Sequence, residues 1–232
     1  SIPSMLDGLK ISQRKILYTC FHEKIRKEIK VVQLSGLATE LTAYHHGELS
    51  IHGLTVRMAQ DFIGSNNIAL LEPCGQFGTR HSGGKDSASP RYIFTRLSPI
   101  TDFIFPEADM NILNYEFEDG KQVEPTYYLP IIPMILVNGT LGVGTGWSTR
   151  VPHYNPIDII HHLEHKIRNT SPTKKLIPWL KGFKGKVIET EIGYESVGIA
   201  IRTSKKTIEI SELPFYRWTE DYKIKLFKIL EK

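Results

Sequence analysis

A loop of small and basic residues ends in a tyrosine that could act as a nucleophile. Gly83–Ser89 is followed by Pro90 and then by the pair Arg91 and Tyr92. A phenol oxygen can attack a phosphodiester, and an adjacent guanidinium can bind the phosphate and lower the cost of ionising the phenol. Small residues let the loop backbone approach a ligand closely. Tyr92 is therefore the candidate nucleophile, and a structural tyrosine in a solvated basic loop is the competing interpretation.

Basic and imidazole side chains elsewhere could bind the phosphates of such a substrate. Arg80, Lys85 and Arg91 fall within twelve residues of one another. His45 and His46 precede a predicted helix, where free backbone N–H groups favour an anion. A metal site at these histidines is disfavoured, because adjacent side chains diverge and neither a cysteine nor a third histidine lies at zinc spacing. We expect no metal site within this chain.

Two further motifs allow both a binding and a structural interpretation. Asp7–Lys10 leads into Gln13-Arg14-Lys15, which is either a capped helix start or a clamp for backbone phosphates. Gly142–Gly146 is similar to part of a nucleotide-binding loop but lacks the Gly-Lys-Ser/Thr ending of a P-loop. Within it, Val143 is either a packed loop residue or a wedge that inserts between base steps.

Composition places the chain among ordinary globular proteins. Of its 232 residues, 41% are hydrophobic and 23% are charged, and no apolar run approaches the roughly 20 residues that span a bilayer. The net charge of +4 is uneven: residues 1–96 carry +4 (12 basic, 8 acidic), 97–172 carry −5 (4 and 9) and 173–232 carry +5 (13 and 8). This distribution weakly favours a polyanionic partner and gives no sign of a membrane segment. The two cysteines favour a reduced intracellular protein, and the start at Ser1 indicates an excised fragment.

Hydrophobic periodicity predicts three helices near the N-terminus. Apolar residues recur at helical spacing in Ile16–Phe21, Val31–Leu41 and Ile51–Phe62. The Tyr44–Gly47 turn separates the last two helices, as in a helix-turn-helix, although any small helical bundle would give the same pattern.

Extended segments after these helices complete a winged-helix pattern. Ile68–Leu71 and Tyr92–Thr95 flank the glycine-rich loop, so Tyr92 would lie on the wing or at its base. Residues 106–128 are polar and acidic, with a turn signal at Glu118-Asp119-Gly120. We place a domain boundary in this segment, which divides the chain into residues 1–125 and 126–232.

The remaining segments predict a mixed second unit, and hence an α+β protein overall. A strand is expected at Tyr128–Asn138, and the glycine-rich Gly139–Gly146 is expected to be a loop. Further helices are expected at Leu97–Phe105, Pro156–Lys166 (with Asn155 as N-cap) and Trp218–Leu230, and further strands at Val187–Ile192, Val197–Thr203 and Thr207–Glu212.

The motifs taken together resemble the breakage-reunion region of a eukaryotic-type (type IIA) DNA topoisomerase II. The match is collinear over most of residues 1–150 and looser beyond. Bacterial gyrase-type proteins are less similar, since they have His-Pro-His-Gly where this chain has His45-His46-Gly47. The matching runs are Ser1–Lys10, Gln13–Lys15, Ala43–Glu48, Gly64–Asn67, Gly75–Arg80, Gly83–Thr95, Pro130–Asn138, Gly142–Ser148 and Thr207–Pro214.

The resemblance implies a fold and a set of roles. It implies a winged-helix (CAP-like helix-turn-helix) domain over residues 1–125, followed by the N-terminal part of a mixed α/β tower domain over 126–232. Tyr92 would attack a DNA phosphodiester to give a transient 5′-phosphotyrosyl link, and Arg91 would stabilise the pentacovalent phosphate. Val143 would intercalate into DNA where the family usually has isoleucine. Support at the cleavage site and on DNA is implied for Asp7, Lys10, Arg14, His45, His46, Arg80 and Lys85.

The resemblance also implies partners and cofactors. The full enzyme would be an ATP-dependent isomerase that works as a homodimer on double-stranded DNA. Mg²⁺ and ATP would bind to domains outside this fragment, which alone is expected to bind neither and to be inactive. A nuclear location is the default, with viral-factory cytoplasm or an organelle as alternatives. The competing hypothesis is a winged-helix DNA-binding or dimerisation module in which Tyr92 is structural.

Overall fold

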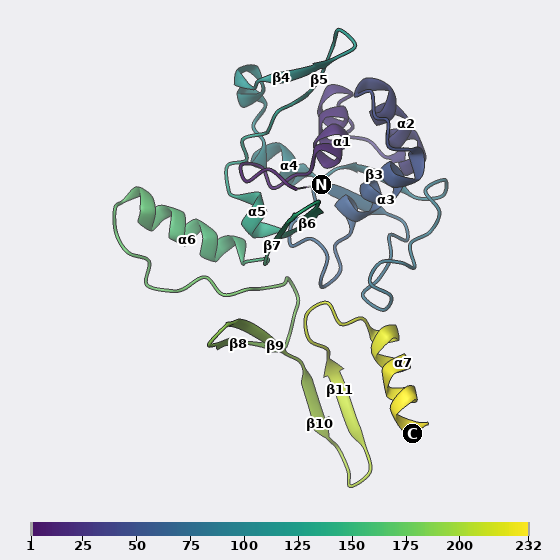
Figure 1. Cartoon of the computed structure of the whole chain (residues 1–232), viewed down its shortest axis with the longest axis vertical. Helices are drawn as coiled ribbons and strands as arrows, with labels where there is room; N and C mark the ends of the chain where they lie inside the picture. The colour runs from purple at the N-terminus through teal and green to yellow at the C-terminus, as the bar shows by residue number, and fades with distance from the viewer. Residues whose placement is uncertain (1, 232) are drawn as a thin grey trace.

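Three helices near the N-terminus form the centre of the hydrophobic core. The computed structural model describes residues 2–231 and shows α1 (Ile11–His22), α2 (Val31–Leu41) and α3 (Glu48–Ala59) packed against one another (Figure 1). The apolar faces that predicted these helices are the faces they bury, because residues three and four apart share one side of a helix. Ile16, Leu34 and Ile51, one from each helix, have no exposed surface.

A three-stranded antiparallel sheet covers these helices, in the order β1-β3-β2. Its strands are β1 (Ile29–Lys30), β2 (Leu71–Cys74) and β3 (Phe94–Leu97). The last two begin later than the sequence predicted. Ile68 instead exchanges two hydrogen bonds with the side chain of Asn138, at 2.9 and 2.7 Å, and the Tyr92 N–H donates to the Ser89 carbonyl in a turn. Tyr92 therefore lies just before β3 and not within it.

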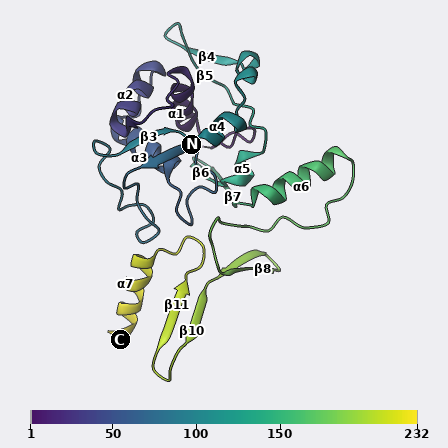
Figure 2. The same cartoon turned by 180° about the vertical axis from the view of Figure 1, so that it is seen from behind.

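A small helical and hairpin segment follows the sheet. It comprises the helix α4 (Pro99–Ile104), the 3₁₀ helix η1 (Glu107–Ile112) and the strands β4 (Tyr115–Glu118) and β5 (Lys121–Pro125). The predicted turn at Asp119-Gly120 is confirmed, since these two residues join β4 to β5. The hairpin projects from the upper part of the molecule beside α1 (Figures 1 and 2).

Two predictions for the next segment are wrong. Tyr128–Asn138 is not a strand: it is an irregular segment followed by the short helix α5 (Met134–Val137). Its two prolines lack the backbone N–H groups that a ladder requires. The glycine-rich Gly139–Gly146 is not a loop, because most of it forms β6 (Thr140–Gly144), paired with β7 (Trp147–Val151). The tight turn between them uses Gly146, whose φ is +76°.

The hydrophobic core continues past the predicted boundary at residue 125. Tyr128, Met134, Val137 and Ile159 belong to the same buried cluster as the first three helices. Ile159 comes from α6 (Pro156–Ile167), where the Asn155 side chain accepts from Ile157 N–H and confirms the predicted N-cap. The packing thus joins residues on both sides of position 125.

The C-terminal elements project away from this core (Figures 1 and 2). They are β8 (Lys186–Thr190), β9 (Gly193–Val197), β10 (Ile199–Arg202), β11 (Ile208–Glu212) and α7 (Thr219–Leu230). The predicted helix at the end is confirmed, but the structure has four strands where the sequence predicted three. The first predicted strand corresponds to β8, and the additional strand β9 follows it after a turn at Glu191-Ile192, in a segment where no strand was predicted. Within residues 2–231, no helix combines the length and the apolar character that a bilayer span requires.

Candidate functional site

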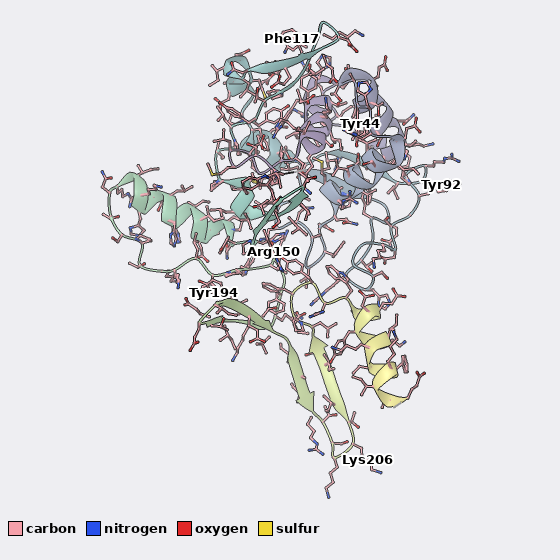
Figure 3. All side chains as sticks on the ribbon, viewed as in Figure 1. Tyr44, Tyr92, Phe117, Arg150, Tyr194 and Lys206 are labelled. Atoms are coloured by element: carbon pink, nitrogen blue, oxygen red, sulfur yellow. The ribbon has the colours of Figure 1, made fainter. Side chains whose placement is uncertain are left out.

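Tyr92 is exposed at the edge of the molecule. Its side chain is 75% exposed, and within residues 2–231 its phenol oxygen has no hydrogen-bond partner. Figure 3 shows it at the outer margin of the upper part of the molecule. Arg91 is also exposed. Both side chains are free to meet a ligand, and the competing interpretation of a structural tyrosine in a solvated basic loop stays open.

The backbone on either side of Tyr92 is fixed to the start of α2. The N–H of Val31 donates to the Ile93 carbonyl at 3.0 Å, and the N–H of Val32 donates to the Pro90 carbonyl at 3.2 Å. These are free donors of the first helical turn, which has no carbonyl of its own helix to bind. The side chain of Ile93 is only 2% exposed. An exposed phenol is therefore carried by an anchored backbone.

The long loop between β2 and β3 is closed on itself. Asp86 accepts from the Thr79 N–H at 2.8 Å and from its hydroxyl at 2.6 Å, and these bonds lower the pKa of the Asp86 carboxyl. Gln60 on the end of α3 donates to the Phe77 carbonyl at 2.8 Å. Lys85 lies in this loop and remains exposed.

A groove of about 1690 Å³ runs along one side of the molecule. It brings together three of the predicted site residues that have a free surface, Lys10, His46 and Val143. Two arginines that were not predicted as site residues also line it, Arg57 on α3 and Arg150 on β7. Figure 3 labels Arg150. The periodicity of α3 could have indicated Arg57, which lies on the polar side of that helix. Arg150 was not identified because the strand that carries it was not predicted.

Tyr92 does not line this groove, and neither do Arg91, His45, Arg80 or Lys85. The roles implied by the resemblance would bring Tyr92 close to Lys10 and His46, but the groove of this chain does not bring them together. The groove is basic, since Asp7 is the one acidic residue among the described residues that line it. Tyr92 and the groove thus lie on separate surfaces of the same chain.

Asp7 and Arg14 are buried and bind each other, which corrects their predicted contact with DNA. Asp7 has no exposed surface and Arg14 is 4% exposed. The guanidinium donates to the carboxylate at 2.8 and 3.1 Å. The same carboxylate accepts from the N–H groups of Leu9 and Tyr128, both at 2.9 Å. Their role is to tie the N-terminal segment to α1 and to the chain near Tyr128.

His45 lies beside an acidic hairpin. Its imidazole is 71% exposed and lies 3.5 Å from a carboxylate oxygen of Glu118. Glu118 also contacts Lys15 at 3.4 Å, and Lys15 pairs with the buried Glu124 at 2.9 Å. The β4–β5 hairpin is therefore linked to the turn that presents His45 and His46.

Arg80 binds residues of its own chain, and this corrects the prediction that it contacts DNA. One of its guanidinium nitrogens lies 2.5 Å from Glu212, and another donates to the Leu213 carbonyl at 2.8 Å. Its side chain is 21% exposed.

Val143 is presented at the exposed face of the β6–β7 hairpin. Its side chain is 66% exposed, and that of Leu141, two residues earlier on the same face of the strand, is 62% exposed. This exposure contradicts the packed loop residue, and the wedge stays a prediction. Leu141 is paired with Arg150 across the hairpin, so an apolar and a cationic side chain lie side by side at the groove.

The described residues 2–231 hold no cluster that fits a metal site. Among residues 2–231, no three His, Cys, Asp or Glu side chains converge on a point where they could hold an ion. Both cysteines are free thiols, and burial raises the pKa of Cys20 to about 12.

A buried histidine beside the groove makes stability depend on pH. Burial lowers the pKa of His153 from 6.5 to about 4, and its Nδ1 lies 2.9 Å from the Tyr216 hydroxyl. Between pH 4 and 6.5 the unfolded chain binds more protons, so stability is full above 6.5 and falls as the pH is lowered. From pH 7 to pH 5 we expect the wild type to lose about 2 kcal/mol more than His153→Gln in denaturant unfolding. The exposed-site variant His45→Gln should follow the wild type, and equal losses in all three proteins would contradict the assignment.

Comparison with known proteins places the chain in a family. Over residues 1–232 the sequence matches the family described as the A subunit of DNA gyrase/topoisomerase IV. The chain belongs to this family. Within it, the predicted resemblance to the eukaryotic type is confirmed by two relatives. It is 54% identical to DNA topoisomerase 2 of Bombyx mori over 223 residues (96% of this chain, 14% of the relative). It is 51% identical to the mitochondrial DNA topoisomerase 2 of Dictyostelium discoideum over 232 residues (100% and 18%).

A solved structure agrees with this membership. The DNA-binding, cleavage and re-ligation domain of Plasmodium falciparum topoisomerase II superposes with a TM-score of 0.97 and 50% identity, covering 99% of this chain and 32% of that chain. The chain thus has the mixed α+β fold of that domain. It spans less than a fifth of the length of these two relatives.

Proposed function

We propose that this chain is the DNA cleavage and religation module of a type II DNA topoisomerase, with Tyr92 as its nucleophile. The observation that carries this proposal is the exposed phenol on an anchored backbone. The side chain is 75% exposed, while hydrogen bonds to α2 hold the residues on both sides of it. A nucleophile requires access to its substrate and a fixed position at once, and few other roles require both.

In the proposed reaction the Tyr92 oxygen attacks a phosphorus atom of the DNA backbone. A bond forms between the phenol oxygen and phosphorus, the bond to the 3′ oxygen breaks, and the phenol proton is transferred to the departing 3′ oxygen through solvent. The products are a 5′-phosphotyrosyl ester and a free 3′ hydroxyl. Arg91 donates to the non-bridging oxygens as negative charge develops on them. The ester retains the energy of the phosphodiester, so the 3′ hydroxyl reverses the step without a high-energy cofactor.

We propose that the metal-binding and ATP-binding domains needed for the reaction lie outside this chain. Mg²⁺ would supply electrophilic assistance at the phosphate, and we propose that it binds to another domain, as does ATP. The isolated chain is then inactive. The separation of Tyr92 from the groove supports a site completed by another domain of the protein or by the second protomer of a homodimer. Two protomers would cut opposite strands and let a second duplex pass.

The groove is the surface that we propose for the duplex itself. Lys10, Arg57 and Arg150 place positive charge along it, as contacts to backbone phosphates require. Among the apolar residues that line the groove, we propose Val143 as the side chain that inserts between adjacent base steps. The Lys205-Lys206 turn at the tip of the β10–β11 hairpin (Figure 3) extends the basic surface beyond the groove.

Truncating the proposed wedge should weaken DNA bending. Val143→Ala removes most of the exposed apolar surface that would enter the base stack. Fewer contacts then offset the free energy that unstacking the bases costs. We expect the bend angle in a fluorescence energy-transfer assay to decrease and cleavage at saturating DNA to fall by about tenfold. Thr149→Ala, on the partner strand of the same hairpin, should change neither. An unchanged bend angle would remove the wedge role.

The nucleophile can be identified directly by mapping the covalent adduct. The full-length protein is incubated with Mg²⁺ and a labelled duplex, the complex is denatured and digested, and the peptide that carries the nucleotide is sequenced by mass spectrometry. We expect the nucleotide on Tyr92. If no residue carries it, the competing module without chemistry is favoured, and an adduct on another residue would disprove the assignment.

For the architecture and location we make three related proposals. Helices α1–α3 with the β1-β3-β2 sheet form a winged helix of CAP-like helix-turn-helix type, whose wing is the loop that carries Tyr92. Strands β8–β11 and α7 form the start of a tower domain, and the continuous core favours a boundary later than residue 125. We propose a nuclear location, with viral-factory cytoplasm or an organelle as alternatives.

A further inference from the structure

The loop that carries Tyr92 is held by a segment from the opposite end of the chain. Arg80 in the loop contacts a Glu212 oxygen at 2.5 Å and donates to the Leu213 carbonyl at 2.8 Å. The Glu212 side chain is only 3% exposed, and its other oxygen accepts from the Lys184 N–H at 3.0 Å. The buried carboxylate thus has an arginine nitrogen beside one oxygen and a backbone N–H bound to the other, so the carboxylate and the guanidinium restrain each other.

A second set of contacts lies next to this pair. Ser82 donates to the Glu220 carboxylate at 2.8 Å, and the Glu220 N–H donates to the His81 carbonyl at 3.0 Å. Gly83 rests against the indole of Trp218, where an added Cβ would lie 2.4 Å from Nε1. Only glycine permits this approach, and its φ of +63° is also one that other residues rarely adopt. The loop therefore docks on residues 212–220 through charge, hydrogen bonds and shape together.

The docked segment of the loop is closed into one unit that lies a few residues before Tyr92. The bonds from Asp86 to Thr79 close residues 79–86 into one unit. After it, the Ala88 N–H donates to the Gln76 carbonyl at 2.9 Å, and the chain then reaches the residues bound to α2. A shift of the docked unit must be taken up in the few residues before Tyr92.

From these contacts we propose that Glu212, acting through Arg80, is a positioning residue for Tyr92 in DNA cleavage. The proposal rests on the proposed function of Tyr92 and extends it to a group far away in the sequence. Glu212 is the last residue of β11, so the strands that project from the core are joined to the loop of the nucleophile. DNA bound along those strands would then affect the placement of the phenol, because it moves the support of the loop.

The test compares cleavage rate with DNA affinity in the full-length protein. Arg80→Ala and Glu212→Gln each remove the ion pair, and we expect single-turnover cleavage at saturating DNA to fall by about 10- to 100-fold, since small misplacements of a reacting group have effects of this size. The dissociation constant for DNA should change by less than about threefold. The double variant should be no worse than the worse single variant, because both act through one contact.

Conservative and matched variants complete the design. Arg80→Lys keeps the charge but cannot reach both partners, so it should recover some of the rate, and it replaces Arg80→Ala if that protein does not fold. Arg96→Ala breaks an ion pair of the same length on β3, between Arg96 and Glu72, that does not reach residues 212–220. It should cleave like the wild type. Hydrogen exchange should accelerate at residues 79–92 in Glu212→Gln and not in Arg96→Ala.

The outcomes separate this proposal from the proposed function. If the wild type forms the Tyr92 adduct and Glu212→Gln cleaves at the same rate, the positioning role is wrong while the proposed function stands. Parallel losses of rate, affinity and thermal stability would show a purely structural pair and overturn the positioning role as well. If the wild type forms no Tyr92 adduct, it is the proposed function that fails.

Discussion

Tyr92→Phe in the full-length protein is expected to abolish covalent DNA adducts and strand passage, with a loss of about 10⁴-fold or more. The substitution removes one oxygen atom, which in the proposed mechanism is the nucleophile itself. The wild-type side chain is 75% exposed, and its oxygen has no hydrogen bond within residues 2–231. The free energy of unfolding should therefore change by less than about 0.5 kcal/mol. Relaxation of supercoiled DNA and gel-trapped adducts measure the two activities.

Three comparisons make this result specific. DNA affinity of Tyr92→Phe should stay within about threefold of the wild type, because the basic groove is intact. Arg91→Ala should reduce cleavage by about 10²- to 10³-fold, as expected for one donor to a developing negative charge. Tyr222→Phe, a tyrosine of α7, should retain full activity. Surviving strand passage in Tyr92→Phe would show that Tyr92 is not the nucleophile and that its role is structural.

Asp7→Ala is expected to reduce the free energy of unfolding by about 3–5 kcal/mol, the usual effect of leaving a buried charge unpaired. The carboxylate has no exposed surface. It pairs with Arg14 at 2.8 Å and accepts from the backbone of Leu9 and Tyr128. Its loss leaves a buried guanidinium and two buried N–H groups without partners. Urea unfolding monitored by circular dichroism gives the difference.

Two variants distinguish this structural role from the predicted contact with DNA. Asp7→Asn retains a hydrogen-bond acceptor but not the charge, so it should lie between the wild type and Asp7→Ala. Asp61→Ala, at an exposed position after α3, should change stability by less than about 0.5 kcal/mol. If Asp7→Ala is as stable as the wild type but binds DNA weakly, Asp7 belongs to the DNA surface after all.

Sequence patterns correctly predicted the helices and the cap that depend only on residues close together in the chain. The helices α1, α2 and α3 were predictable because their apolar residues recur at helical spacing, and the N-cap at Asn155 because a side-chain acceptor there satisfies a free N–H. The segment Tyr128–Asn138 was mispredicted as a strand. A short apolar run that contains prolines has no regular alternation, so its pattern does not distinguish a strand from an irregular segment. The β6–β7 hairpin was missed because its glycines hid the alternation of exposed and buried positions.

The sequence by itself indicated the family, predicted Tyr92 and Arg91 as the candidate nucleophile and its partner, and determined the excess of basic residues at both ends of the chain. Residue type and order carry these directly. Only the tertiary structure showed that Asp7 and Arg14 are buried together, that Arg80 is bound by Glu212, and that Arg57 and Arg150 face the groove. The sequence does not distinguish a basic side chain that faces solvent from one that binds a carboxylate. Its partner can lie more than a hundred residues away, and only the packing of the chain brings the two together.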